Sequence, residues 1–184
     1  MLVKEVVALA AETLGRSDLA DSLSSLTGDP QGELKSLLRC YNLIENEVAL
    51  DFFPLKAVEV FAPNNGQILF ARFQNAPVNI LQVTNASGDP LEYSVFVTHL
   101  VVPAQLKSVF VTYTYRPAAK TFKDTVAFPE NISARLLAFG VASEFCITNR
   151  QFEEGAMWGR RYRDALRAAG IYRRTLSVRS RRWI

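Results

Sequence analysis

The spacing of hydrophobic residues changes twice along the chain. Up to residue 53, apolar residues recur every three or four positions, which is typical of amphipathic helices. Between residues 54 and 123 they alternate with polar residues in short runs, which is typical of strands. Helical spacing returns from residue 124. This order predicts an α+β fold: a helical bundle from the N- and C-terminal helices, with an inserted antiparallel β unit.

The N-terminal part is predicted to hold three helices. Residues 2–14 form the first, and Ser17 is placed to cap a short second helix. Asp29 followed by Pro30 predicts the start of a long third helix, because proline at the first position has no amide to leave unpaired. Pro54 marks its end. Its apolar face comprises Leu34, Leu37, Leu38, Tyr41, Ile44 and Val48.

The middle of the chain is predicted to hold five antiparallel strands in a small sandwich or barrel. Their apolar runs cover residues 57–61, 67–73, 78–84, 92–102 and 109–115. Asn65-Gly66 is a strong signal for a tight turn between the first two runs. The later runs carry apolar residues on both faces, so we expect one face to pack against helices or a neighbouring subunit.

The C-terminal part is predicted to form a pair of helices, the second ending near Ala169. Thr148 and Gln151 have the spacing of a capping box. Gly155 and Gly159 each cost about 1 kcal/mol relative to alanine within a helix. Either another helix approaches them closely or they are merely tolerated. The expected apolar side comprises Phe152, Ala156, Gly159, Tyr162 and Leu166.

Charge is distributed unevenly along the chain. Residues 150–184 hold ten arginines and three acids, whereas residues 1–149 have a net charge of −4. A basic end on an acidic body favours an interaction tail, although a solvated tail that only aids solubility is the alternative. The predicted organisation has four parts: N-terminal helices (1–53), the β unit (54–123), C-terminal helices (124–170) and an extended basic arm (171–184).

The sequence offers little catalytic chemistry. It has one histidine, His99, within an apolar strand pattern, and two separated cysteines, Cys40 and Cys146. These residues do not make a zinc site of the usual kind, and no nucleophile elbow or phosphate-binding loop is present. We expect buried free thiols, no metal, no cofactor and no enzymatic activity.

Three segments together resemble the head-to-tail adaptor (connector) proteins of tailed bacteriophages. The first is LLRCYNLIENEVALDFFPL at residues 37–55. The second is FGVASEFCITNRQFEEGAMWGRRYRDALRAA at residues 139–169. The third is the final Arg-Arg-Trp-Ile. With the order helices, strands, helices, the resemblance covers most of the chain, although none of the segments is a catalytic signature.

The resemblance implies a structural virion protein in the neck between capsid and tail, assembled in the host cytoplasm. Such adaptors form a homo-oligomeric ring, commonly a dodecamer, beneath the portal protein. The ring extends the DNA channel, through which double-stranded DNA passes transiently, and is the platform for the tail or stopper protein. No membrane contact is implied.

The resemblance also implies that the C-terminal arm docks on the portal. Its candidate contact residues are Ile171, Tyr172, Arg173, Arg174, Leu176, Val178, Arg179, Arg181, Arg182, Trp183 and Ile184. Arginine and tryptophan are enriched in interface hot spots. Two alternatives stay open. One is a basic-tailed nucleic-acid-binding or DNA-packaging accessory protein, since arginine and aromatic side chains also contact phosphates and bases. The other is an interaction domain of a different kind.

Overall fold

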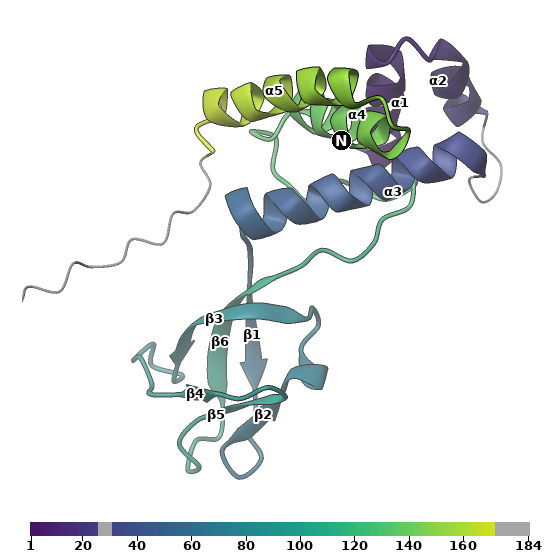
Figure 1. Ribbon diagram of the computed structural model, residues 1–184. Coiled ribbons are helices and arrows are strands. Elements are labelled where there is room, and N and C mark those ends of the chain that lie inside the picture. Colours follow the sequence, from purple (N-terminus) through teal and green to yellow (C-terminus); the bar gives the residue numbers. More distant parts are fainter. Residues whose placement is uncertain (26–30, 172–184) are drawn as a thin grey trace, which may run out of the picture.

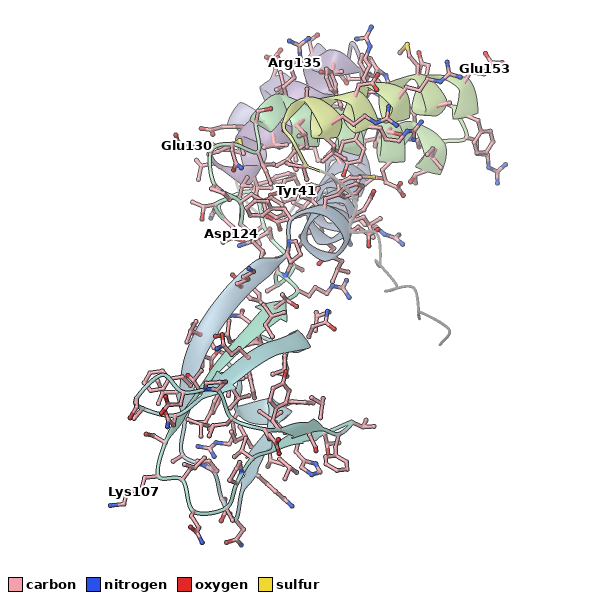
Figure 2. The ribbon with its side chains drawn as sticks, turned by 90° about the vertical axis from the view of Figure 1, so that its left-hand side faces the viewer. Tyr41, Lys107, Asp124, Glu130, Arg135 and Glu153 are labelled. Carbon is pink, nitrogen blue, oxygen red and sulfur yellow. The ribbon has the colours of Figure 1, made fainter. Side chains whose placement is uncertain are left out.

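The computed structural model describes residues 1–25 and 31–171. It has the predicted α+β architecture: helices from both ends of the chain pack together, and the β unit is inserted between them. Figure 1 shows the β unit projecting from one side of the helical bundle. Lys107 lies near the far end of the β unit, and Arg135 and Glu153 lie at the opposite end of the molecule (Figure 2).

The bundle is built around α4, which packs against α1, α3 and α5. Its helices are α1 (Val3–Thr13), α2 (Ser17–Ser24), α3 (Gly32–Glu47), α4 (Ala134–Thr148) and α5 (Phe152–Ala168). One π-helical turn, η1 (Val48–Phe52), continues α3. The apolar faces predicted for the first and third helices meet in one core, with Tyr41 fully buried inside it (Figure 2).

Two predicted helix starts are wrong. Ser17 is the first residue of α2 rather than its cap, and the capping position is taken by Arg16, which makes no side-chain cap. The Arg16 guanidinium instead bridges to Glu33 of α3, with 2.6 Å between Nη2 and Oε2. The third helix begins at Gly32, later than the start predicted at residues 29–30, which lie outside the described residues.

The capping box predicted between α4 and α5 is also wrong. Thr148 is the last residue of α4, and Gln151 precedes α5 without a side-chain cap. A cap does form at the start of α4, where the Ser133 hydroxyl accepts a hydrogen bond from the Leu136 amide at 3.2 Å.

The two glycines of α5 allow α4 to approach closely. A Cβ at Gly155 would lie 2.9 Å from Cγ1 of Ile147, and one at Gly159 would lie 3.0 Å from Oγ of Ser143. The Ser143 hydroxyl donates to the Gly155 carbonyl at 2.8 Å. Close approach therefore explains both glycines. Phe152 and Ala156, both predicted on the apolar side, are instead exposed, Phe152 by 64%.

The β unit contains six strands in two antiparallel three-stranded sheets rather than five strands. The orders are β1-β6-β3 and β2-β5-β4. The strands are β1 (Leu55–Phe61), β2 (Gln67–Leu69), β3 (Pro77–Thr84), β4 (Ser94–Val95), β5 (His99–Val101) and β6 (Val109–Tyr115). The run predicted as one strand over 92–102 is a hairpin, closed by a hydrogen bond from the Phe96 amide to the His99 carbonyl.

The tight turn predicted at Asn65-Gly66 is confirmed, because both residues have positive φ (48° and 76°). Asn64 and Gln67 exchange backbone hydrogen bonds across it. The strands on either side do not pair with each other, however: β1 pairs with β6, and β2 with β5. The turn therefore passes the chain from one sheet to the other, over a second core centred on Phe73 and Tyr113.

The chain returns from the β unit to the bundle along a polar face of α3. The Asn42 side chain pairs with the backbone of Lys120 twice: its Nδ2 donates to the carbonyl at 3.1 Å, and its Oδ1 accepts from the amide at 2.6 Å. One turn later, Asn46 accepts a hydrogen bond from Nε of Arg116 at 2.9 Å. The returning segment, residues 116–127, is therefore bonded along α3.

Glu45 completes this junction from a fully buried position. Its carboxylate accepts from the Ala127 amide at 2.9 Å and from the Tyr41 hydroxyl at 2.8 Å. Loss of hydration raises the pKa of the Glu45 carboxyl group, although both hydrogen bonds and nearby Lys120 oppose that shift. The hydrogen bond from Ala127 holds the returning segment in place, and burial disfavours the charged form of the Glu45 carboxyl group.

Substitution of Glu45 by Gln should flatten the pH dependence of stability. A carboxyl group whose pKa is raised by folding stays protonated to a higher pH in the folded state than in the unfolded state. Its contribution to stability is therefore greatest below about pH 4.3, its pKa in the unfolded chain. That contribution is lost as pH rises through the folded pKa. We expect Glu45→Gln, relative to wild type, to gain unfolding free energy between pH 4.5 and 7.5 in urea titrations.

Exposed Glu130 provides the matched control. Glu130→Gln should track the wild-type pH profile. An unchanged difference between wild type and Glu45→Gln across this range would show that the buried carboxyl carries no such penalty.

Candidate assembly surfaces

The side chains that the sequence offers for metal binding or nucleophilic chemistry are two cysteines, one histidine and the carboxylates. No group of three His, Cys, Asp or Glu residues in residues 1–25 and 31–171 is placed to hold a metal ion. Burial raises the pKa of both free cysteines, Cys40 and Cys146, to about 11, so their thiols stay protonated near neutral pH. His99 lies half-buried on β5, stacked on Phe96 with 4.9 Å between ring centroids.

No helix in the described part of the chain is long and apolar enough to span a membrane.

The arm begins at a fixed point on the bundle. Gly170, at φ +69°, ends α5, and the Ile171 amide donates to the Leu166 carbonyl at 2.9 Å. With the bond from the Gly170 amide to the Arg167 carbonyl, this is a Schellman motif. Ile171 is 7% exposed and belongs to the bundle core. The other predicted site residues, from Tyr172 to Ile184, lie outside the described residues.

A groove of about 500 Å³ opens beside Ile171, between α3 with η1 on one side and α4 and α5 on the other. Its apolar lining includes Ile44, Phe52, Gly140, Leu166 and Ile171. Its charged lining comprises Glu47 and Asp51 from α3 and η1, Glu144 from α4, and Arg163 and Arg167 from α5. The groove therefore has an apolar interior and an acidic wall on α3 and η1, and its opposite wall carries Glu144 as well as the two arginines.

Tyr162 lines the groove with a hydroxyl group that lacks a partner. The side chain is 5% exposed, and its oxygen finds no hydrogen-bond partner among the described residues. Burial raises the pKa of Tyr162, and the negative charges of Glu47 and Asp51 add to the shift, so the phenol stays protonated. A buried unpaired hydroxyl costs roughly 1–3 kcal/mol.

The most exposed large apolar residues of the β unit fall into two sets. The β1 patch consists of Val58 and Val60, which are 61% and 57% exposed, beside Phe110 on β6. The hairpin tip consists of residues 95–97, from the last residue of β4 into the turn before β5, where Val97 is 96% exposed. The two patches belong to different sheets. Exposed apolar groupings of this kind mark interaction surfaces when they are contiguous.

A stack of cationic and aromatic side chains joins α4 to α5. The Phe139 and Trp158 rings are stacked with centroids 5.7 Å apart. Arg135 lies over the Phe139 ring at 5.3 Å, and Arg161 lies over the Trp158 ring at 4.8 Å. The stack stabilises the helix pair and leaves both arginine side chains at the surface.

No protein-family model matches this chain, and no similar protein is found among the curated proteins.

Sequence reasoning missed the groove and the hairpin tip. The groove arises where α3 meets the α4–α5 pair, which is distant from it in sequence, so no local pattern marks it. The tip did carry a signal: Val95, Phe96 and Val97 are consecutive apolar residues, which a strand with one buried face would not need.

Ile171 should behave as a core residue rather than as part of a detachable arm. Ile171→Ala should lower the free energy of unfolding by about 2–5 kcal/mol, the range for deletion of a buried aliphatic side chain. A chain ending at Ile171 should keep the stability of the full-length protein, whereas one ending at Gly170 should lose it. Urea unfolding of the three variants tests this, and equal stability of the two truncated chains would contradict it.

Proposed function

We propose that the protein is a head-to-tail adaptor of a tailed bacteriophage. Copies of the chain form a ring beneath the portal protein, extend the DNA channel and provide the platform for the tail or stopper protein. The arm that follows Ile171 contacts the portal. The proposal rests first on the exposed apolar surface of the β unit, which offers two separate patches for contacts with neighbouring copies.

Ring formation requires two different surfaces on each copy. In a head-to-tail ring, one patch of each subunit contacts a different patch of the next, and the contact is heterologous. The β1 patch and the hairpin tip meet this requirement, since they are separate apolar patches on different sheets. An adaptor ring uses such a pair to close on itself.

The charge distribution supports contact of the arm with a second protein. The basic arm follows directly from Ile171, whose position on the bundle is fixed by the Schellman motif. In a ring, every copy presents one arm at the same place, so contacts that are weak singly act together. Arginine suits such contacts because its guanidinium group binds carboxylates through two parallel hydrogen bonds.

The alternative is a nucleic-acid-binding or DNA-packaging accessory protein. The observation that favours it is the exposed arginine surface of α5, made by Arg160, Arg161, Arg163 and Arg167. Phosphate contacts from such a surface would make binding fall steeply with salt.

Co-sedimentation with the purified portal protein from the same genome tests the proposal. Full-length chain should sediment with the portal at ring stoichiometry, and a chain ending at Ile171 should not. The truncation keeps Ile171 so that the bundle remains intact. Failure to bind the portal, together with salt-sensitive binding of a DNA duplex, would overturn the proposal in favour of the alternative.

Replacement of an exposed valine by a charged residue should separate assembly from folding. Val60→Glu should abolish ring formation on the portal while leaving the thermal unfolding of the isolated chain nearly unchanged, because the side chain is exposed. Val60→Thr, of similar shape, should weaken assembly less. If Val60→Glu formed rings at the same protein concentration as the wild-type chain, the β1 patch would be excluded from the subunit contact.

A further inference from the structure

The groove beside Ile171 has no role in the proposed adaptor function. It combines three features: an apolar interior, an acidic wall on α3 and η1, and the unpartnered hydroxyl group of Tyr162. Ile171 is one of its lining residues. Residues 172–184 therefore follow directly from the lining of a groove that an extended peptide would fit.

We infer that this groove is the docking site for residues 172–184 of the same molecule, which folds back along α5 and stays there until a partner displaces it. The inference goes beyond the proposed function and does not depend on it, because it concerns a contact within one chain.

The length of the segment is sufficient. The groove is lined along α5 and the turn that follows it, from Gly159 to Ile171, which spans at most about 18 Å at 1.5 Å per helical residue. An extended chain advances at most about 3.3–3.6 Å per residue, so roughly six residues cover that length. Residues 172–177 are enough to line the groove, and residues 178–184 extend beyond it.

Charge complementarity favours this occupant. Arg173 and Arg174 follow directly after Ile171, and the groove wall on α3 and η1 supplies Glu47 and Asp51. The opposite wall carries Arg163 and Arg167, which would repel the arm, so its arginines must face α3 and η1. Glu144 of α4 adds a third carboxylate to the lining.

Leu176 and Tyr162 account for the rest of the fit. Leu176 is the first large aliphatic residue of the segment, and the groove interior at Ile44 and Leu166 is apolar. A peptide lying across Tyr162 brings backbone carbonyl groups that its hydroxyl can donate to. That hydrogen bond would relieve the cost of a buried unpaired hydroxyl group.

Attachment to Ile171 favours binding within one molecule over binding to a neighbour. A short flexible connection gives an effective concentration in the millimolar range, above that of any second copy in dilute solution. A docked arm also reduces the apparent affinity for a competing partner, since the partner must first release it. The groove would then restrain premature contacts of the arm.

Fluorescence anisotropy of a labelled peptide with the sequence of residues 172–184 tests the inference. The peptide should bind a chain ending at Ile171, and it should bind the full-length chain at least about tenfold more weakly, because the attached arm competes. Glu47→Gln combined with Asp51→Asn should weaken peptide binding to the truncated chain. Glu12→Gln combined with Glu130→Gln, both exposed and outside the groove, should not.

Two further measurements keep the outcomes distinct. A peptide of the same composition in scrambled order should bind more weakly, since placement of Leu176 matters as well as charge. Tyr162→Phe, which removes only the hydroxyl group, should weaken peptide binding without loss of chain stability.

Equal affinity of the peptide for the truncated and full-length chains would overturn the inference, as would insensitivity to the groove variants. Concentration-dependent dimers of the full-length chain that disappear on truncation would show that the arm binds a second copy, and docking within one molecule would be wrong. None of these measurements uses the portal, so their failure leaves the adaptor proposal standing.

Discussion

The structure depends on how one polar face of α3 holds the segment that returns from the β unit. Asn42, Glu45 and Asn46 present side-chain groups at successive positions of that face, and the returning segment satisfies them with Lys120, Ala127 and Arg116. Without these bonds, the buried carboxyl group of Glu45 would lack a backbone donor, a costly state in a helical core. The insertion is therefore secured at its exit by hydrogen bonds as well as by the covalent chain.

This junction lets one chain carry two kinds of surface in a defined arrangement. The bundle has the larger core and presents the groove and the starting point of the arm. The β unit has its own core around Phe73 and Tyr113 and presents the exposed apolar patches. Tyr115, at the end of β6, packs against both cores. Such a division suits the proposed function, in which each copy contacts neighbouring copies in a ring and also contacts the portal protein.

The sequence predicted most of the fold because amphipathic patterns report burial directly. The order of elements and the turn at Asn65-Gly66 were visible in it, whereas for Gly155 and Gly159 it left open whether a helix approaches closely or the glycines are merely tolerated. Strand pairing was not, because β6 supplies the centre of a sheet whose partners lie far away in sequence. The groove escaped for a similar reason, since it exists only where α3, α4 and α5 meet. Ile171 was assigned to the arm because no local pattern marks the Schellman turn's apolar contact.

Amide hydrogen exchange at Lys120 and Ala127 measures the anchoring of the β unit most directly. Both amides donate to side chains of α3, so they should exchange as slowly as the buried amides of that helix. The neighbouring exposed residues Ala118 and Ala119 should exchange much faster. Rapid exchange at Lys120 and Ala127, equal to that of Ala118 and Ala119, would show that residues 116–127 form a loose linker and would contradict a defined arrangement of the two surfaces.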